Sequence, residues 1–404
     1  MKRTLWGKGH FMKGLEKELA MNERAAHIVS VLERRIGEMP FLHALIGFDG
    51  YIDELMRVVE SRDSAGTASY FQDITGFSRR IAAAAGRSAD LEVVTDTIKL
   101  GGNGPIMANA LAGMGVPTVC IGAMGYPEIR AEFKAMSADC RSISLCQPAH
   151  THALEFNDGK LMFADLAALE QLTWETIIDQ IGRNDLASLF RESSLIALVN
   201  WSGVPGADRI WHGIYQEILP ELDGEGLAGQ KGLCGRQTGA GMEEPHRRRQ
   251  VFFDLADPSK RTKEDIQSVL SLIRSYEDYC DVMLGLNENE ALCLAASIGR
   301  GCADPEEAAL RLYDLLGISA VVVHPIDRCI VVTADGLIAE QGHVVESPKI
   351  STGGGDNFNA GFCLGQLLGL GYRDSMLLGM TVSGYYVENG KSPSAQEIAE
   401  HLMK

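Results

Sequence analysis

The chain has 404 residues, of which 46% are hydrophobic and 23% charged, a composition typical of a globular protein rather than a disordered or collagen-like chain. At roughly 150 residues per domain, this length predicts two or three units, or one large α/β unit with attachments. The 37 Lys and Arg residues against 54 Asp and Glu residues give a net charge of −17. Phosphate backbones and anionic membranes repel such a chain, so we expect no nucleic-acid partner and no membrane partner.

Cysteine usage and the start of the chain indicate the compartment. The nine cysteines form no Cys-x-x-Cys pair, so the sequence predicts neither a disulfide framework nor a zinc cluster. The N-terminal segment is interrupted by Lys, Glu and Gly before an apolar stretch of signal-peptide length can form. No apolar run of membrane-spanning length occurs either. We therefore expect a cytoplasmic protein.

The first 165 residues predict a leading helix, a βαβ-like region and a hairpin. Apolar residues recur at helical spacing over 15–36, and Pro40 ends this helix. A buried strand is expected over 43–50, a largely peripheral insertion over 61–97, a helix over 107–114 and a strand over 118–125. The segment 151–163 alternates on both sides of Asn157-Asp158-Gly159, which predicts a hairpin outside the main sheet.

The remainder of the chain alternates between strands and helices. A strand is expected over 194–201, a helix over 208–219, a Gly-rich loop over 221–241, and then alternating strands and helices that end in a long helical region from Gly355. Such alternation is typical of a parallel sheet covered by helices on both faces.

A glycine-rich turn is the strongest chemical signal. Gly353, Gly354 and Gly355 allow several backbone N–H groups to point in one direction, and the following helix adds its positive N-terminal end, so the turn suits an anion. Asp356 lies in the first helical turn, where the same field is expected to keep its carboxylate ionised and able to accept a proton. Ordinary turn and capping chemistry remains the alternative.

A second glycine segment opens the helix near residue 107. Gly101 and Gly102 would let a ligand lie directly on the backbone, and Asn103 can both donate and accept hydrogen bonds to hydroxyls. The dinucleotide fingerprint fails here because Met107 stands where the last glycine is needed, and Phe358 breaks the same pattern after Gly353. A dinucleotide-dependent redox enzyme is therefore disfavoured, whereas a tight turn without a ligand remains open.

Two pairs of residues with side-chain oxygen atoms follow predicted strands. Asn287 and Glu290 are three residues apart, so on a helical turn they share a face and could hold a hydrated divalent cation. Asp49 and Asp53 follow the first strand, where polar groups tend to meet small ligands. The alternative for Asn287 and Glu290 is surface helix capping, and for Asp49 and Asp53 it is a turn residue and a helix N-cap.

Taken in order, these segments resemble the ribokinase-like PfkB family of carbohydrate kinases. The resemblance runs from about residue 42 to the C-terminal region and is carried by the motifs GFDGYID, GGNGPIMANALAGMG, DPSKR, NENE and GGGDNFNAGF. It implies a three-layer α/β/α sandwich with a small β lid, and phosphoryl transfer from ATP to a hydroxyl of a sugar or sugar-like alcohol. Residues 1–40 would form an N-terminal helical extension, and 41–404 the kinase domain, with lid segments near 51–100 and 151–165.

The resemblance also implies a role for each motif. Asp356 takes the position of the catalytic base and residues 353–355 that of the anion hole. The substrate-binding residues would be Asp49, Asp53, Gly101, Gly102 and Asn103. The residues near the nucleotide would be Asn287, Thr352 and Asn357, with Asn287 and Glu290 organising Mg²⁺ through water. The resemblance leaves a monovalent cation and a homodimer through the lid open.

Three positions depart from the family pattern. Ile350 stands where an acidic residue is usual six positions before the base, Ile106 where Asn is frequent, and residues 324–327 where a Thr-x-Gly stretch is expected. These departures motivate a second hypothesis from another class, a kinase-fold protein that binds a sugar or nucleotide with weak or absent transfer. Our leading hypothesis is the ATP- and Mg²⁺-dependent sugar kinase.

Overall fold

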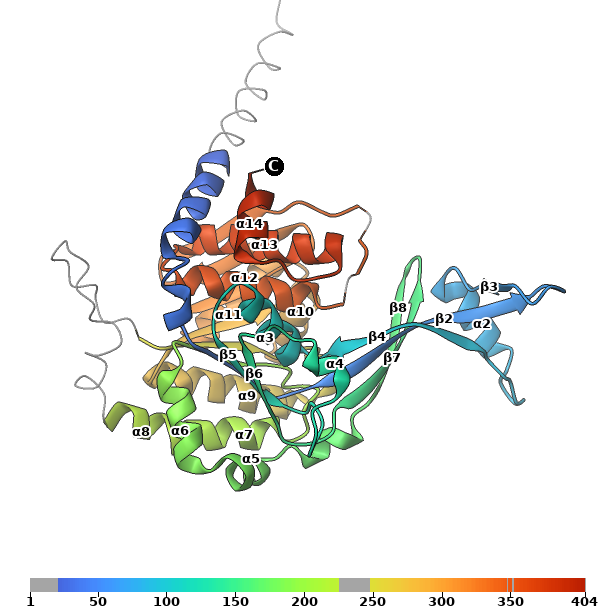
Figure 1. The fold of residues 1–404 in the computed structure, drawn as a ribbon, viewed down its shortest axis with the longest axis horizontal. Coiled ribbons are helices and arrows are strands. Elements are labelled where there is room, and N and C mark those ends of the chain that lie inside the picture. Colours follow the sequence, from blue (N-terminus) through green and yellow to red (C-terminus); the bar gives the residue numbers. More distant parts are fainter. Residues whose placement is uncertain (1–20, 225–247, 347, 351, 404) are drawn as a thin grey trace, which may run out of the picture.

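The protein is described by a computed structural model that covers residues 21–224, 248–346, 348–350 and 352–403 (Figure 1). Its centre is a nine-stranded sheet in the order β14-β13-β12-β11-β10-β9-β1-β5-β6. All neighbouring pairs from β12 to β6 are parallel, whereas β13 and β14 are antiparallel. The strands are β1 (Ala44–Gly47), β5 (Thr118–Gly122), β6 (Cys140–Ser144), β9 (Leu195–Leu198), β10 (Gln250–Asp254), β11 (Asp281–Leu286), β12 (Ala320–Val323), β13 (Arg328–Thr333) and β14 (Gly336–Gln341).

Helices cover both faces of this sheet, as the alternation of strands and helices predicts. Alternate strand residues point to opposite faces, so Ile196 packs into one core and Ala197 into the other. The first core is covered by α5 (Trp174–Ile181), α6 (Arg183–Glu192), α7 (Ala207–Gly213), α8 (Leu219–Gly224), α9 (Lys263–Ser275), α10 (Glu288–Ser297) and α11 (Pro305–Leu316). The second is covered by a helix over 21–35, α3 (Asn103–Gly113), α4 (Ala131–Lys134), α12 (Gly354–Leu367), α13 (Tyr372–Asn389) and α14 (Ala395–Leu402).

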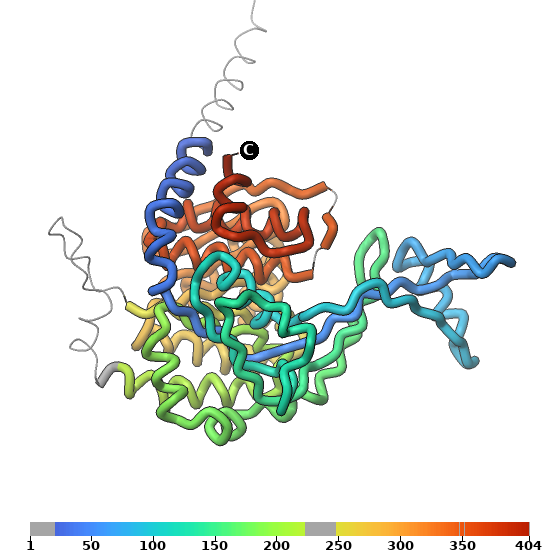
Figure 2. The backbone as a smooth tube through the Cα atoms, viewed as in Figure 1, coloured from blue at the N-terminus to red at the C-terminus, as the bar shows by residue number. Residues whose placement is uncertain are grey.

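A second sheet projects from this body, as the ribbon and the backbone trace both show (Figures 1 and 2). It consists of β2 (Tyr51–Arg62), β3 (Ala68–Tyr70), β4 (Val93–Gly101), β7 (Ala149–Phe156) and β8 (Gly159–Asp165). The predicted hairpin is confirmed, because β7 and β8 pair in antiparallel register with Phe156 opposite Gly159. The projection brings two chain segments that are far apart in sequence into one sheet.

The interpretation of 61–97 as a peripheral insertion needs correction. β2 continues to Arg62, and β3 and the start of β4 lie within the same segment, so much of it belongs to the second sheet. Helix α2 (Ile74–Ala82) packs Phe77 against Met56, Val58 and Leu154 of this sheet. The segment is therefore built around a small apolar cluster of its own.

Local signals set several helix boundaries. Thr262 and Asp265 form a reciprocal capping box at the start of α9, and Gly317 ends α11 in the left-handed conformation. The helix expected over 208–219 is interrupted by a π-helical stretch over Ile214–Ile218. Part of the leading helix (15–20) and most of the Gly-rich loop lie outside the described residues. No helix in the described ranges is long and apolar enough to span a membrane.

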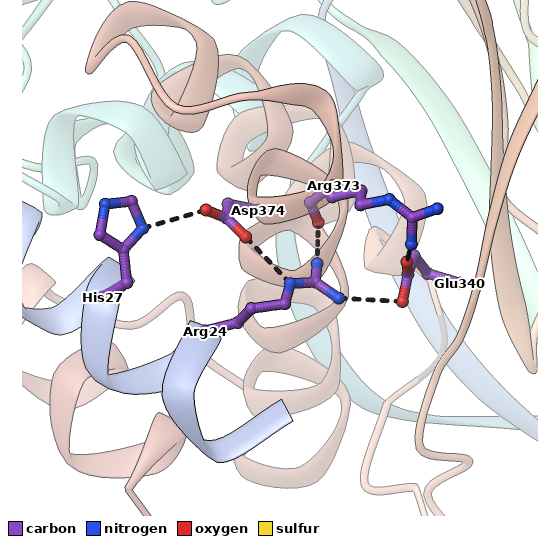
Figure 3. A network of polar contacts seen from close by, with 5 residues as sticks. All are labelled: Arg24, His27, Glu340, Arg373 and Asp374. Atoms are coloured by element: carbon purple, nitrogen blue, oxygen red, sulfur yellow. Dashed lines mark hydrogen bonds and ion pairs between the residues drawn. The ribbon is translucent and has the colours of Figure 1, made fainter. Parts of the chain in front are cut away.

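Apolar contacts and ion pairs join the helix over 21–35 to the C-terminal part of the chain (Figure 3). Its apolar face buries Ile28 and Leu32 in the second core. On its polar side, Arg24 donates from Nε to Asp374 Oδ1 and from Nη1 to Glu340 Oε2, each over 3.0 Å. Asp374 lies in the first turn of α13, and Glu340 lies on β14. The helix thus bridges β14, the antiparallel edge strand of the large sheet, and the start of α13.

We expect Arg24→Ala to lower the free energy of unfolding by about 1–2 kcal/mol, because charge-assisted bonds to two partly buried carboxylates are lost together. Urea denaturation followed by circular dichroism would measure the change. Arg34→Ala, on an exposed position of the same helix, is the matched control and should alter stability by less than about 0.5 kcal/mol. Equal effects of the two substitutions would contradict the role of this network.

Candidate active site

The carboxyl ends of the parallel strands bring polar side chains to one edge of the large sheet. Asp49 follows β1, Asn200 follows β9, Asp254 ends β10, Asn287 follows β11 and His324 follows β12. The N-termini of α3 and α12 begin at the same edge. In open α/β sheets this edge is where ligands bind, so the strand order itself positions the site.

Asp49 is fully buried and holds the start of α3. Its carboxylate accepts hydrogen bonds from the backbone N–H of Asn103 (2.9 Å), the backbone N–H of Gly104 (2.8 Å) and Asn200 Nδ2 (2.7 Å). A Cβ atom at Gly104 would lie 2.7 Å from Asp49 Oδ1, and one at Gly102 3.0 Å from Oδ2. Burial raises the pKa of Asp49 to about 6, in spite of these hydrogen bonds. Asp49 therefore caps the N-terminus of α3, although it lies more than 50 residues before this helix in the chain.

Asp53 lies on β2 and faces the body of the protein. In the register of the second sheet it is paired with Lys99 on β4 and Thr151 on β7. Burial raises the pKa of Asp53, and the charge of Lys99 opposes this rise. A Cβ atom at Gly101 would lie 2.4 Å from Asp53 Cγ. Contrary to the expectation that a ligand lies directly on the glycine backbone, the space beside Gly101 is taken by the Asp53 carboxyl group.

The turn over residues 353–355 has the shape of an anion nest. Gly353 has a φ of +96°, in the left-handed region, and the next two glycines begin α12. Asn357 is fully buried and donates from Nδ2 to the Gly353 carbonyl over 2.8 Å, so it fixes the turn from inside. The Thr352 carbonyl accepts a hydrogen bond from the Tyr386 hydroxyl over 3.0 Å. The free amides at the helix start are thereby held in one orientation.

Asp356 is 9% exposed and lies in the first turn of α12. Its pKa is raised well above the ordinary range, first by burial and then by the charges of Asp254, Asp49, Glu290 and Asp53. Burial and the converging carboxylates therefore oppose the field of the helix N-terminus, which favours the ionised form of Asp356. Within the described residues, its carboxylate is in no ion pair.

Asn287 and Glu290 form a capping box at the start of α10. Asn287 Oδ1 accepts from the Glu290 backbone N–H over 3.0 Å, and Glu290 Oε2 accepts from the Asn287 backbone N–H over 2.8 Å. Both side chains therefore cap α10, and their role at a cation stays a prediction. Burial and the charge of Asp254 raise the pKa of Glu290 to about 9. In the described part of the chain, no group of three or more His, Cys, Asp or Glu side chains is arranged to hold a metal ion.

Several site residues escaped the sequence analysis. Asp254 is buried, and its Oδ2 accepts from Asn359 Nδ2 over 2.8 Å. The Asn103 amide also hydrogen-bonds Asp254, so this amide serves the carboxylate cluster. From the second sheet, Lys160 hydrogen-bonds Thr352 Oγ1, and Lys99 Nζ is buried with no hydrogen-bond partner in the described part of the chain. Asp254 could have been found from its place at the end of a strand, whereas both lysines depend on the register of the second sheet.

The departures from the family pattern have structural consequences at this site. Ile106 is buried, and its Cδ1 lies 3.2 Å from the position that a Cβ at Gly353 would occupy. It therefore packs α3 against the nest. Ile350 makes a backbone hydrogen bond to Val387 over 3.4 Å. His324 lies beside Phe358, with ring centroids 4.6 Å apart.

For the sugar kinase that the sequence resembles, we expect Lys99→Met to raise KM for the sugar several-fold, because the substitution removes the positive charge that opposes the raised pKa of Asp53. Steady-state kinetics with the sugar varied at saturating nucleotide would measure this. Lys99→Arg should retain most of the affinity because it keeps the charge, and Lys263→Met on distant α9 serves as the control. An unchanged KM in Lys99→Met would argue against this role.

The three-layer sandwich, the second sheet and the glycine nest with its adjacent carboxylate define a carbohydrate kinase with the ribokinase fold. Comparison with known proteins gives the narrower class. The sequence matches the prokaryotic ketohexokinase family over residues 22–226 and 241–404, and the chain belongs to this family. The family match thus confirms the hypothesis of a carbohydrate kinase, and it favours this hypothesis over that of a kinase-fold protein that only binds its ligands.

Individual relatives agree with this assignment. The chain is 28% identical over 356 residues to a ketohexokinase of Haloferax volcanii, covering 88% of this chain and 89% of the relative. Among solved structures, a probable sugar kinase from Rhizobium etli has a TM-score of 0.61 at 16% identity, covering 90% of this chain and 97% of its own. A ribokinase of Arabidopsis thaliana, solved with ribose and ATP, has a TM-score of 0.59 at 14% identity, covering 91% and 100%. These likenesses bear out the expected fold.

Proposed function

We propose that the chain transfers the γ-phosphoryl group of ATP to a hydroxyl of a ketohexose. The observation that carries the proposal is the convergence of the glycine nest, the adjacent Asp356 and the Asp53 side chain at the carboxyl edge of the large sheet. The ketohexose as acceptor is supported by the family match and by the name of the Haloferax volcanii relative.

The chain's own groups account for the transfer. Asp356 would orient the attacking hydroxyl and accept its proton, a contribution typically of about 10²–10⁴ in rate. The amides of residues 353–355 would stabilise charge on the transferred group without reorganisation of solvent. Lys160, which hydrogen-bonds Thr352 beside the nest, would add positive charge from the second sheet. Asp53 would hold sugar hydroxyls on the opposite side.

The buried carboxylates fit a divalent cation bound through water. The pKa values of Asp254 and Glu290 are both raised, first by burial, and such groups gain from a nearby positive charge. Asn287 and Glu290 would orient the hydrating water molecules. Bound there, the cation would supply charge neutralisation for the phosphates, whereas the described residues alone form no complete metal cage.

The second sheet would act as the lid of this site. Its Asp53, Lys99 and Lys160 side chains face the body, so closure over a sugar would exclude water from the phosphoryl group. Transfer to water would then be suppressed in favour of transfer to the sugar. The lid segments near 51–100 and 151–165 would thus serve to exclude water during phosphoryl transfer.

ADP release from the purified full-length chain tests the proposed function. Candidate acceptors are ketohexoses, aldohexoses, sugar phosphates and nucleosides, each with ATP and Mg²⁺. We expect a ketohexose to give the highest kcat/KM in the panel. Binding of ATP without phosphorylation of any acceptor would instead support the weak or inactive kinase-fold protein.

We also propose that the chain works in the cytoplasm. The cysteines in the described ranges are all free, which suits a reducing compartment. Thiol titration of protein purified under native, non-reducing conditions should therefore recover unpaired cysteines.

The outer face of the lid suits a homodimer. Ile98, Glu54, His152 and Phe163 form a row across β4, β2, β7 and β8, on the face opposite Asp53. Ile98 and Phe163 are 53% and 54% exposed. Sedimentation velocity should show a dimer that Phe163→Asp converts to monomer, whereas Leu310→Asp on α11 leaves it intact. A monomeric unaltered protein would contradict this proposal.

A further inference from the structure

Two lysines of the second sheet, Lys99 on β4 and Lys160 on β8, lie on the same face of that sheet. Asp53 pairs with Lys99 on one side and with Thr151 on the other, so these residues share a row. Glu155, four positions after Thr151 on β7, pairs with Lys160. Because side chains alternate between the two faces of a strand, both lysines lie on the face from which Asp53 points to the body.

The ammonium groups of the two lysines interact although their strands are not neighbours. β2 and β7 separate β4 from β8 in the second sheet. Burial lowers the pKa of Lys160, the carboxylate of Glu155 opposes this effect, and the positive charge of Lys99 lowers the pKa further. The two long side chains therefore extend toward a common region. Such convergence of like charges is unfavourable unless an anion lies close to both.

The Lys99 ammonium group lacks an acceptor. Its Nζ atom is buried and makes no hydrogen bond to any residue that the structure describes. Burial lowers the pKa of Lys99, whereas three nearby carboxylates favour the charged form, those of Asp53, Glu155 and Asp356. An ammonium group carries three N–H donors, and leaving them unsatisfied in a buried position is costly. A ligand with acceptor oxygens would remove this cost.

The two lysines reach the body at the two ends of the proposed transfer. Lys160 hydrogen-bonds Thr352 Oγ1, directly before the glycine nest that would hold the phosphates. Lys99 shares its row with Asp53, which would hold the sugar, and it interacts with the charge of Asp356. A phosphoryl group that leaves the nest for a sugar hydroxyl beside Asp356 would therefore come close to both ammonium groups.

We propose that Lys99 and Lys160 form a binding subsite for the phosphate group of a phosphorylated sugar, the product of the transfer. The inference rests on the proposed function, which supplies this product. A phosphate monoester carries a charge of about −1.5 to −2 near pH 7, so it matches two ammonium groups. A neutral sugar hydroxyl would leave the repulsion between the lysines uncompensated.

The subsite takes no covalent part in the reaction. The new O–P bond forms at the sugar oxygen while the bond between the phosphorus and the leaving oxygen of ADP breaks. The hydroxyl proton goes to Asp356, and both lysines keep their protons. Their contribution is to bind the phosphate once it is attached to the sugar.

Calorimetric titration of the full-length chain without nucleotide tests the subsite. The probes are D-fructose, as a ketohexose, and its 1-phosphate and 6-phosphate. We expect the unaltered chain to bind one of the two esters more tightly than fructose. Lys99→Met should weaken binding of that ester by about 10- to 100-fold, at least about five times more than binding of fructose. Lys99→Arg should retain most of the ester affinity because it keeps the charge.

ADP and a distant lysine provide the controls. ADP lacks the transferred phosphoryl group, so Lys99→Met should leave ADP binding within about twofold. Lys263→Met, at an exposed position on α9, should leave all affinities unchanged. Equal losses for ester and fructose would show that Lys99 acts only through Asp53 and would overturn the inference. A chain that binds neither ester more tightly than fructose would overturn it as well.

A second variant covers the case in which Lys99→Met does not fold. Lys160→Met, on another strand, must then show the same selective loss of ester affinity, and its absence overturns the subsite. Inhibition kinetics distinguish a product from a phosphorylated acceptor. The bound ester should compete with the ketohexose and release no ADP, whereas ADP release with the ester would overturn its assignment as product.

Failure of the proposed function gives a different result. If the unaltered chain binds an ester but phosphorylates no sugar, the function is wrong while the Lys99 comparison still gives a result. If the chain phosphorylates a ketohexose and Lys99→Met binds the ester as tightly as the unaltered chain, the inference alone is wrong.

Discussion

Replacing Asp356 with Asn should lower kcat for sugar phosphorylation by about 10²- to 10⁴-fold, because the amide cannot accept the proton of the attacking hydroxyl. ADP binding should stay within about threefold. Asn has the size and shape of the Asp356 carboxyl group, so the turn that would receive the phosphates should keep its conformation. Coupled ADP-release kinetics and calorimetric titration with ADP would measure the two quantities.

Asp185→Asn provides the matched control, since Asp185 lies in the first turn of α6 at an exposed position. It should leave kcat unchanged. A fall of less than about fivefold in Asp356→Asn would show that another group removes the proton. Loss of ADP binding in parallel with kcat would show that the substitution has damaged the nest instead.

The same residue sets the direction of a pH dependence. Asp356 acts as a base only when ionised, and burial with four neighbouring carboxylates raises its pKa. The kcat/KM of the free enzyme should therefore fall on the acid side at a pH above the usual range of an aspartate. A profile that stays flat down to about pH 4 would be inconsistent with Asp356 as the base.

The location of the site could be predicted from the sequence because it depends on local features. Asp49 and Asp254 end or follow apolar strand segments, and parallel strands place these ends at one edge. The nest over residues 353–355 needs only successive glycines before a helix. Both features can be recognised from a few consecutive residues.

The electrostatic state of Asp356 could not be predicted in the same way. Its pKa depends on side chains that come from β2, β10, α10 and the loop after β1, and these distances are fixed only by packing of the whole chain. The pairing of Lys99 with Asp53 likewise depends on the register between β4 and β2, which contains an irregularity after Leu55. Sequence periodicity carries no information on either point.

The groups that lie beside the site glycines show the same difference between local and tertiary information. The sequence predicts that a ligand lies on the backbone of Gly101. A side chain is indeed excluded at this position, because its Cβ atom would collide with a neighbouring group. The group that uses the space is the carboxyl of Asp53, 48 positions earlier in the chain by residue number. Which group fills such a space depends on tertiary contacts, so the chemical role of a glycine cannot be derived from its neighbours in sequence.

The carboxylate cluster should make the unliganded protein less stable as the pH rises. Burial raises the pKa of Asp49 to about 6 and that of Glu290 to about 9, above the values expected in the unfolded chain. The folded state therefore binds protons more tightly than the unfolded state. The associated stabilisation is complete below the unfolded pKa values and is lost as the pH rises through the folded ones. The relevant window is from about pH 4 to about pH 9.

Glu290→Gln tests this window. At pH 5 the variant and the unaltered chain should have similar free energies of unfolding, because Glu290 is largely protonated in the folded state and little is gained by its removal. At pH 8, without Mg²⁺ or nucleotide, the variant should be more stable by a few kcal/mol, at about 1.4 kcal/mol for each unit of pKa difference. Gln can still accept the hydrogen bond from the Asn287 backbone, so the start of α10 is preserved.

Urea denaturation at both pH values would measure the difference. Glu288→Gln, at an exposed position in the first turn of the same helix, is the control and should show no pH-dependent gain. If Glu290→Gln is less stable than the unaltered chain at pH 8, the Glu290 carboxylate is ionised and satisfied in the folded protein. In that case the cluster would need no bound cation to offset its charge, and the physical support for the Mg²⁺ position would be lost.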